Sequence, residues 1–154
     1  MKLKYFILPL LLIIATTYVS KAENRIIIDK PNCMLYVVNE NNDTIFQVPC
    51  CPGKNLGDKK VRGDRKTPEG NFKIQTMERA AHWVDSKGRV TGDYGPWFMR
   101  IEMPDWNSIG IHGTNSPESV GTRDSWGCIR LHNDDLEVLY KLVGIGTPVT
   151  ILPD

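Results

Sequence analysis

Residues 108–132 read SIGIHGTNSPESVGTRDSWGCIRLH, and the interpretation of the whole chain starts from this stretch. A short apolar run ends at His112-Gly113, a polar loop follows, and the loop ends in Ser125-Trp126-Gly127-Cys128. A histidine at the end of a strand and a cysteine after a glycine are what a thiol nucleophile with an imidazole base requires. The imidazole takes the thiol proton, and the resulting imidazolium then stabilises the thiolate. We therefore predict that Cys128 is a catalytic nucleophile and that His112 is its base.

The residues around this pair suggest how it is held. The carbonyl of Gly113 can accept a hydrogen bond from one ring nitrogen of His112, which leaves the other nitrogen free to face the sulfur. The backbone N–H groups of Gly127 and Cys128 are the expected oxyanion donors, because the turn at the nucleophile points them inward. Ser125 is expected to tighten this turn rather than to bind substrate.

Trp126 and Arg130 each admit two interpretations. Trp126 is either a flat apolar wall of the substrate site or part of the core. The planar guanidinium of Arg130 either binds a substrate carboxylate through two hydrogen bonds or forms a structural ion pair with Asp124 or Asp134. Residues i and i+2 of an extended segment share a face, so Arg130 can reach the cleft that Cys128 lines. The sequence leaves both alternatives open.

Two upstream segments extend the pattern. Pro52–Lys59 reads PGKNLGDK, and Gly63–Phe72 reads GDRKTPEGNF. Together with His112-Gly113 and Ser125–Cys128, these segments resemble the L,D-transpeptidase (YkuD-like) family, whose motifs include GD-x-x-TPEG and Ser/Thr-X-Gly-Cys. The resemblance extends over roughly residues 25–152. Many members of the family carry a second histidine just before the Gly-Cys pair, and Trp126 occupies that position here, so no role of a second imidazole is carried over.

The resemblance implies an exported bacterial cell-wall enzyme whose donor and acceptor are peptidoglycan stem peptides. The Cys128 thiolate would attack the carbonyl of the third residue of a tetrapeptide stem and expel the terminal D-alanine. An amine of a second stem would then resolve the thioester into a 3→3 cross-link, without a metal or an organic cofactor. Two alternatives stay open: hydrolysis of the same thioester by an L,D-carboxypeptidase, and a non-catalytic peptidoglycan-binding module.

Residues 1–22 are interpreted as a secretory signal peptide and residues 23–154 as one catalytic domain. Lys2 and Lys4 form a basic start, residues 5–19 are apolar but short for a membrane span, and residues 20–22 resemble a cleavage site. We expect a location in the periplasm or cell envelope, with no stable membrane span after cleavage. Cleavage removes three lysines and no acid, so the formal net charge changes from +1 to −2. This charge gives no electrostatic basis for binding nucleic acid.

Short β-branched and alternating runs predict a mainly β chain. Strands are expected at residues 25–29, 33–38, 44–50, 71–78, 97–103, 108–112 and 147–152, with a hairpin around residues 39–43. Residues 51–70 and 79–96 are expected to be long loops, the second overhanging the site. One helix is expected after Cys128, capped by Asn133 and ended by Gly144. The family resemblance implies a β-sandwich-like sheet assembly with the active site under loops.

Besides Cys128 the chain has three cysteines, so one disulfide can form among them. Cys33 faces Cys50 across the predicted hairpin, which makes this the favoured pair, and Cys51 is the adjacent alternative. An exported protein can form such a bridge, but the register has to suit it, so a fully reduced chain is equally a possible outcome.

The histidines raise the question of a metal. Cys128, His132 and His112 have a spacing that a zinc site can use. However, residues 129–132 should run extended into the helix, which points Cys128 and His132 apart, and a fourth ligand is not evident. We therefore expect no metal, with His132 near the surface and His82 in the polar excursion without a partner.

Overall fold

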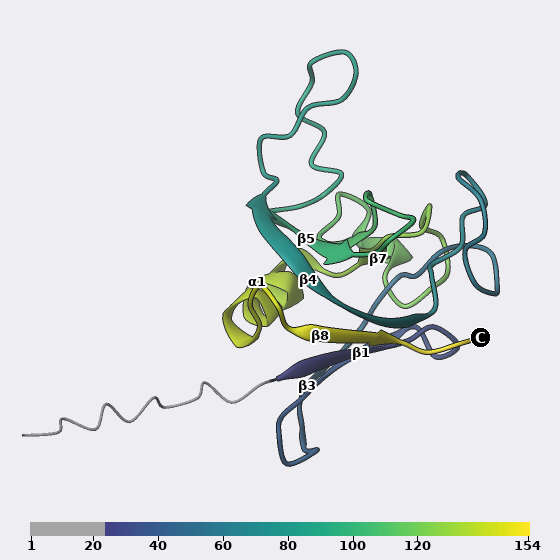
Figure 1. The fold of residues 1–154 in the computed structure, drawn as a ribbon. Coiled ribbons are helices and arrows are strands. Elements are labelled where there is room, and N and C mark those ends of the chain that lie inside the picture. The colour runs from purple at the N-terminus through teal and green to yellow at the C-terminus, as the bar shows by residue number, and fades with distance from the viewer. Residues whose placement is uncertain (1–23) are drawn as a thin grey trace, which may run out of the picture.

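The structure, a computed structural model, describes residues 24–154 and is mainly β (Figure 1). The signal peptide predicted for residues 1–22 lies outside the described residues. Most elements lie within one or two residues of their predicted positions, and the short β7 and the 3-10 turn η1 are additions. The elements are β1 Arg25–Asp29, β2 Met34–Val38, β3 Thr44–Pro49, β4 Gly70–Arg79, β5 Trp97–Glu102, β6 Gly110–His112, η1 Pro117–Ser119, β7 Ile129–Arg130, α1 Asn133–Leu142 and β8 Pro148–Ile151.

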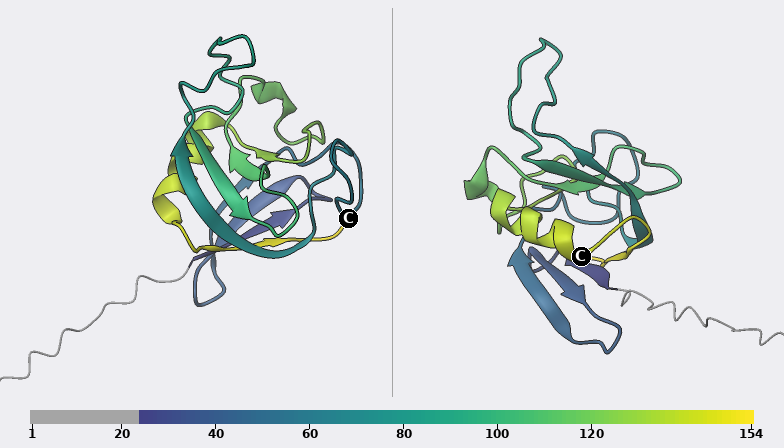
Figure 2. Two further views of the ribbon diagram at one scale, coloured as in Figure 1. Left: turned by 45° about the horizontal axis from the view of Figure 1, so that its top comes forward. Right: turned by 90° about the vertical axis from the view of Figure 1, so that its left-hand side faces the viewer.

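All eight strands belong to one sheet in the order β3-β2-β1-β8-β4-β5-β6-β7. The predicted hairpin joins β2 to β3, and β2 also pairs antiparallel with β1. β8 pairs parallel with β1 and antiparallel with β4, so it joins the two halves of the sheet. The sheet curls strongly, and its halves enclose a shared interior (Figures 1 and 2). The expected mainly β sheet assembly with one helix is confirmed, in the form of a single curled sheet.

The interior follows from the alternating pattern of the strands. In β1, Ile26 and Ile28 are buried while their neighbours are only half-buried, as the two-residue period of a strand requires. The same cluster contains Met99 from β5 and Ile111 from β6, so both halves of the sheet contribute to it. Each such side chain stabilises the fold by about 1.5–3 kcal/mol when it is fully buried.

Helix α1 covers part of this interior and lies against the curled sheet (Figure 2). Leu136 and Leu139 are its fully buried residues. The predicted capping role of Asn133 is wrong: His132 occupies the N-cap position without a side-chain cap, and Asn133 accepts a hydrogen bond from the Thr114 N–H at 2.9 Å instead. Asn133 therefore ties the start of the helix to the loop after His112. No helix among residues 24–154 has the length and apolar character needed to cross a membrane.

All four cysteines are free thiols in the structure. Cys33 and Cys50 do lie opposite each other, as the hairpin predicts, and the Cys50 N–H donates to the Cys33 carbonyl at 2.7 Å. Cys33, Cys50 and Cys51 are buried, and burial raises the pKa of both Cys33 and Cys50. Cys128 is half-buried and is the one cysteine of the four that is not buried.

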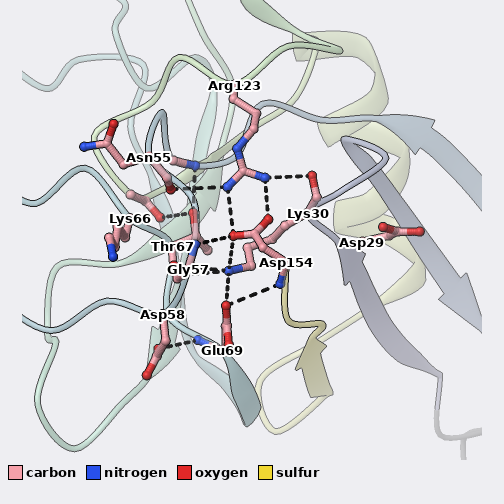
Figure 3. A network of polar contacts seen from close by, with 12 residues as sticks. Asp29, Lys30, Asn55, Gly57, Asp58, Lys66, Thr67, Glu69, Arg123 and Asp154 are labelled. Atoms are coloured by element: carbon pink, nitrogen blue, oxygen red, sulfur yellow. Dashed lines mark hydrogen bonds and ion pairs between the residues drawn. The ribbon is translucent and has the colours of Figure 1, made fainter.

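A buried lysine connects distant parts of the chain (Figure 3). The Lys30 side chain, just after β1, has no exposed surface, and its ammonium lies 2.7 Å from Glu69 and 3.0 Å from Asp154. Arg123 binds the same Asp154 at 2.7 Å and also donates to the Lys30 carbonyl. Although burial alone would raise it, contacts with Lys30, Gly57 and Arg123 lower the pKa of Asp154. The network joins the end of β1, the loop before β4, the loop after η1 and the segment after β8.

We predict that Lys30→Ala lowers the free energy of unfolding by about 3–5 kcal/mol, because it leaves Glu69 partly buried without its cation and leaves Asp154 with Arg123 alone. Lys73→Ala is the matched control, since Lys73 pairs with Glu102 at 3.2 Å but both side chains are about half-exposed. Such a surface pair contributes about 0–1 kcal/mol. Urea unfolding of both variants checks the difference, and equal losses would contradict the structural role of Lys30.

Candidate active site

The strands β6 and β7 bring the predicted catalytic residues together. They pair in parallel, with Ile111 opposite Ile129 and His112 opposite Arg130. Cys128 directly precedes β7, and successive side chains of a strand point to opposite faces. Cys128 and Arg130 therefore share the face of the sheet on which His112 lies. All three line one hollow of about 320 Å³.

His112 is buried and contacts two aromatic rings. Its Nδ1 lies 2.6 Å from the carbonyl oxygen of Gly113, which is the contact that the sequence suggested. Phe98 of β5 stacks on the imidazole with ring centroids 5.5 Å apart, and Tyr94 meets it edge-on at 5.0 Å. An Nδ1–H that donates to Gly113 leaves Nε2 as the basic nitrogen.

Burial lowers the pKa of His112 to about 4, although the contact with Gly113 acts in the opposite direction. Burial likewise raises the pKa of the Cys128 thiol, although the Gly110 N–H and the charge of Arg130 act against it. The Cys128 sulfur lies 3.4 Å from the carbonyl oxygen of Ser108. Both groups are therefore neutral at pH 7, and the free site holds an imidazole and a thiol rather than an imidazolium and a thiolate.

Two hollows meet at the thiol. The first is the hollow of about 320 Å³ that contains His112 and Arg130, and the second has a volume of about 610 Å³. Both are lined by Tyr94, Trp126 and Cys128. The sulfur therefore stands where two separate ligand groups can approach it from different sides.

The turn before Cys128 is organised by Ser125. Its hydroxyl accepts the Gly127 N–H at 3.0 Å and donates to the Cys128 carbonyl, and the residue is buried. This geometry agrees with the turn-forming role expected from the sequence. It also corrects one expectation: the Gly127 N–H is already bonded to Ser125, so it is not a free oxyanion donor. Among the described residues, no partner is found for the Cys128 N–H, which remains available.

Trp126 lies on the surface, with 63% of it exposed. The Arg65 guanidinium stacks over its ring at 3.8 Å from the centroid. Because the indole lines both hollows and is not packed in the core, the interpretation of Trp126 as a wall of the site fits its position better.

Arg130 has no structural ion pair within residues 24–154. Asp124, one proposed partner, instead pairs with Lys54 at 3.3 Å, and Asp134 forms no ion pair with Arg130. The Arg130 side chain is half-buried and lines the hollow that contains His112. Its charge therefore faces the site without a salt bridge, although the carboxylate of Asp93 lines the same hollow.

The remaining histidines do not join the site. His132 lies at the N-cap of α1, and His82 is exposed in the 79–96 excursion. In the part of the chain that the structure describes, no three side chains of His, Cys, Asp or Glu gather as metal ligands do. The arrangement of Cys128, His132 and His112 that a zinc site would need is therefore not formed.

The sequence did not predict the roles of two residues at the site, Tyr94 and Thr67. Tyr94 covers the imidazole of His112, and its carbonyl accepts the Gly113 N–H at 2.9 Å. Thr67, expected from the sequence only to lie in the long loop of residues 51–70, donates from its hydroxyl to the Gly127 carbonyl at 2.8 Å. The sequence offered a weak indication for Tyr94, because the loop of residues 79–96 was expected to overhang the site. No sequence feature predicts that Thr67 contacts Gly127.

Comparison with known proteins shows the family to which the chain is similar. The sequence model of the L,D-transpeptidase catalytic domain matches residues 23–151. YkuD of Bacillus subtilis, whose name places it among the L,D-transpeptidases, is 34% identical over 111 residues, which are 72% of this chain and 56% of that protein. The chain therefore spans just over half the length of this relative.

Solved structures show the same fold. An L,D-transpeptidase from Mycobacterium smegmatis aligns with a TM-score of 0.63 and 23% identity over 84% of this chain and 58% of that one. The helical cell shape determining protein Pgp2 from Campylobacter jejuni aligns with a TM-score of 0.63 and 25% identity over 86% of this chain and 49% of that one. With its sequence matched over residues 23–151 and its curled sheet shared with these structures, the chain belongs to the L,D-transpeptidase catalytic domain family.

Proposed function

We propose that this protein is an exported L,D-transpeptidase that acts on peptidoglycan tetrapeptide stems through a thioester on Cys128. The observation that supports this most directly is the shared hollow. The half-buried Cys128 and a buried, oriented imidazole lie on the same face of neighbouring strands and line one cavity. Membership of the L,D-transpeptidase catalytic domain family supports the same chemistry.

The reaction begins from the neutral pair. As the Cys128 sulfur attacks the carbonyl carbon of the third residue, the thiol proton passes to Nε2 of His112. The carbonyl oxygen becomes an oxyanion, and the Cys128 N–H is the free backbone donor beside it. When the tetrahedral intermediate collapses, the imidazolium returns the proton to the leaving amine of D-alanine, and a thioester remains.

The second half of the reaction resolves the thioester. An amine of a second stem attacks the thioester carbonyl, loses its proton to His112 and releases the Cys128 thiol, which completes a 3→3 cross-link. The two hollows provide one place for each stem. The donor occupies the one that Arg130 lines, and the acceptor approaches through the larger one. Because Cys128 is not buried, hydrolysis of the thioester is the competing outcome, and it would make the protein an L,D-carboxypeptidase.

Incubation with defined disaccharide tetrapeptides should give a Cys128 adduct whose mass equals the donor minus D-alanine, followed by dimers linked 3→3. Cys128→Ala should lose both the adduct and the dimers but keep the melting temperature, because it removes the nucleophile and little buried volume. Cys33→Ala is the matched control and should remain active. Turnover by Cys128→Ala would refute the mechanism, and tripeptides formed without dimers would identify the carboxypeptidase.

The pH dependence follows from the low pKa of His112. The base form of a group with a pKa of about 4 is already complete near pH 5. We therefore expect the rate of Cys128 acylation to rise with pH through an acidic limb near pH 4 and to stay level through neutrality. Stopped-flow acylation at saturating and limiting donor measures this limb. A limb near the ordinary histidine value of about 6.5 would show that the imidazole is solvated during the reaction.

Arg130 is expected to bind a carboxylate of the donor stem. A charge-assisted hydrogen bond of this kind contributes about 1.5–3 kcal/mol, so Arg130→Ala should lower kcat/KM about ten- to a hundredfold. Arg130→Lys keeps the charge but not the planar fork, so its loss should be smaller yet clear. The measurement compares both variants on donors with a free and an amidated carboxylate. Additive losses from mutation and amidation would exclude recognition and leave Arg130 a structural role.

A further inference from the structure

Thr67 contacts the turn of residues 125–128, which carries Cys128, without lining the site itself. It lies in the long loop between β3 and β4, is fully buried and lines neither of the two hollows that meet at Cys128. Its hydroxyl donates to the carbonyl oxygen of Gly127 at 2.8 Å and accepts the Gly53 N–H at 2.8 Å. A hydroxyl has one proton to donate, so the bond to Gly127 uses the whole donor capacity of this side chain.

The bond to Gly127 fixes the direction of the next N–H. The C=O of Gly127 and the N–H of Cys128 belong to one planar peptide unit, and no cis peptide is found in the described chain. In a trans peptide these two groups point in opposite directions. With its oxygen held by Thr67 on the side away from the hollows, the unit aims the Cys128 N–H towards the side on which the thiol is attacked.

The backbone at Gly127 would not keep this orientation unaided. Its φ of +127° lies in a region that favours glycine, which can adopt many other conformations at little cost. A Cβ on this residue would lie 2.7 Å from the Lys66 carbonyl oxygen, so the loop that carries Thr67 packs directly against the turn. The Ser125 hydroxyl holds the N–H of Gly127, and the Thr67 hydroxyl holds its carbonyl.

Thr67 is itself held in place by the Lys30 network. The Lys30 ammonium lies 3.4 Å from the Thr67 carbonyl and 2.7 Å from Glu69, two residues further along (Figure 3). The segment that carries the Thr67 hydroxyl is therefore held in position by its contacts with Lys30.

We propose that Thr67 is a positioning residue that aims the Cys128 N–H at the oxyanion formed during acyl transfer. The inference rests on the proposed role of Cys128 as the nucleophile. It assigns Thr67 no contact with substrate and no part in proton transfer. It requires that loss of the hydroxyl impair steps that create an oxyanion and leave other reactions of the same sulfur unchanged.

Two reagents separate these reactions in the full chain. p-Nitrophenyl acetate acylates the Cys128 sulfur through a tetrahedral oxyanion and releases p-nitrophenolate, whereas iodoacetamide alkylates it by displacement of iodide, without an oxyanion. In Thr67→Val we expect acylation to fall at least about tenfold, towards the roughly hundredfold loss that removal of an oxyanion donor causes. Alkylation should keep its wild-type rate. Peptide mass spectrometry assigns both adducts to Cys128.

Two controls test whether the effect is only structural. Thr67→Ser keeps the hydroxyl and should restore acylation. Thr147→Val removes another threonine hydroxyl that accepts a glycine N–H, from Gly144 at 2.9 Å, but it lies before β8 and should not change the ratio of the two rates. If Thr67→Val does not fold, Thr67→Ala removes the same hydroxyl and should likewise lower acylation more than alkylation.

The outcomes are distinct. Equal losses of acylation and alkylation in Thr67→Val, or no loss of either, would overturn the positioning role while leaving Cys128 as the nucleophile. Wild-type protein that is alkylated on Cys128 but acylated there neither by p-nitrophenyl acetate nor by a disaccharide tetrapeptide would overturn the proposed function, and the inference with it.

Discussion

The buried ammonium of Lys30 is the interaction on which the arrangement of the loops depends. Its side chain has no exposed surface, and it binds carboxylates that come from the loop before β4 and from the segment after β8. A charge in the interior is costly unless it is paired and hydrogen-bonded, so these segments are held at fixed positions relative to the end of β1. Arg123 extends the constraint to the loop after η1 through Asp154. The turn that carries Cys128 is therefore held from two sides, because the network fixes both Thr67, which contacts Gly127, and Arg123, which lies just before the turn.

The imidazole of His112 and the thiol of Cys128 are both neutral before the reaction begins. Phe98 and Tyr94 exclude water from His112, so its imidazole is neutral, and the thiol beside it is neutral for the same reason. Charge appears only when a carbonyl is attacked. At that moment the site offers the Cys128 N–H to the oxyanion, and the guanidinium of Arg130 lies in the same hollow. A site of this kind leaves its cysteine weakly reactive towards solutes that do not bind.

The sequence predicted the elements and the central pair because those depend on local patterns. The β-branched run at residues 25–29 and the apolar run at residues 33–38 predicted strands within one residue of β1 and β2, and the contact between His112 and the Gly113 carbonyl followed from adjacency. The partners of Asn133, Thr67 and Lys30 depend on the curl of the sheet, which no local pattern encodes. Asn133 satisfies every rule for a helix cap, yet the N–H of Thr114 competes for its oxygen after folding. The low pKa of His112 likewise could not be predicted from the sequence, because it results from burial under aromatic rings that come from other segments.

The place of β8 in the sheet has a consequence for how the chain is made. Residues 148–151 are synthesised after the other seven strands of the sheet, yet they pair with β1 on one side and with β4 on the other. Until they emerge, Ile26 and Ile28 of β1 have an unpaired neighbouring edge, and the halves of the sheet have no strand between them. Pairings between such distant segments form slowly, and unpaired strand edges aggregate readily. The sheet of the nascent chain therefore remains open until β8 has been made, and any factor that shields apolar strands during synthesis has β1 to β7 to act on before that point.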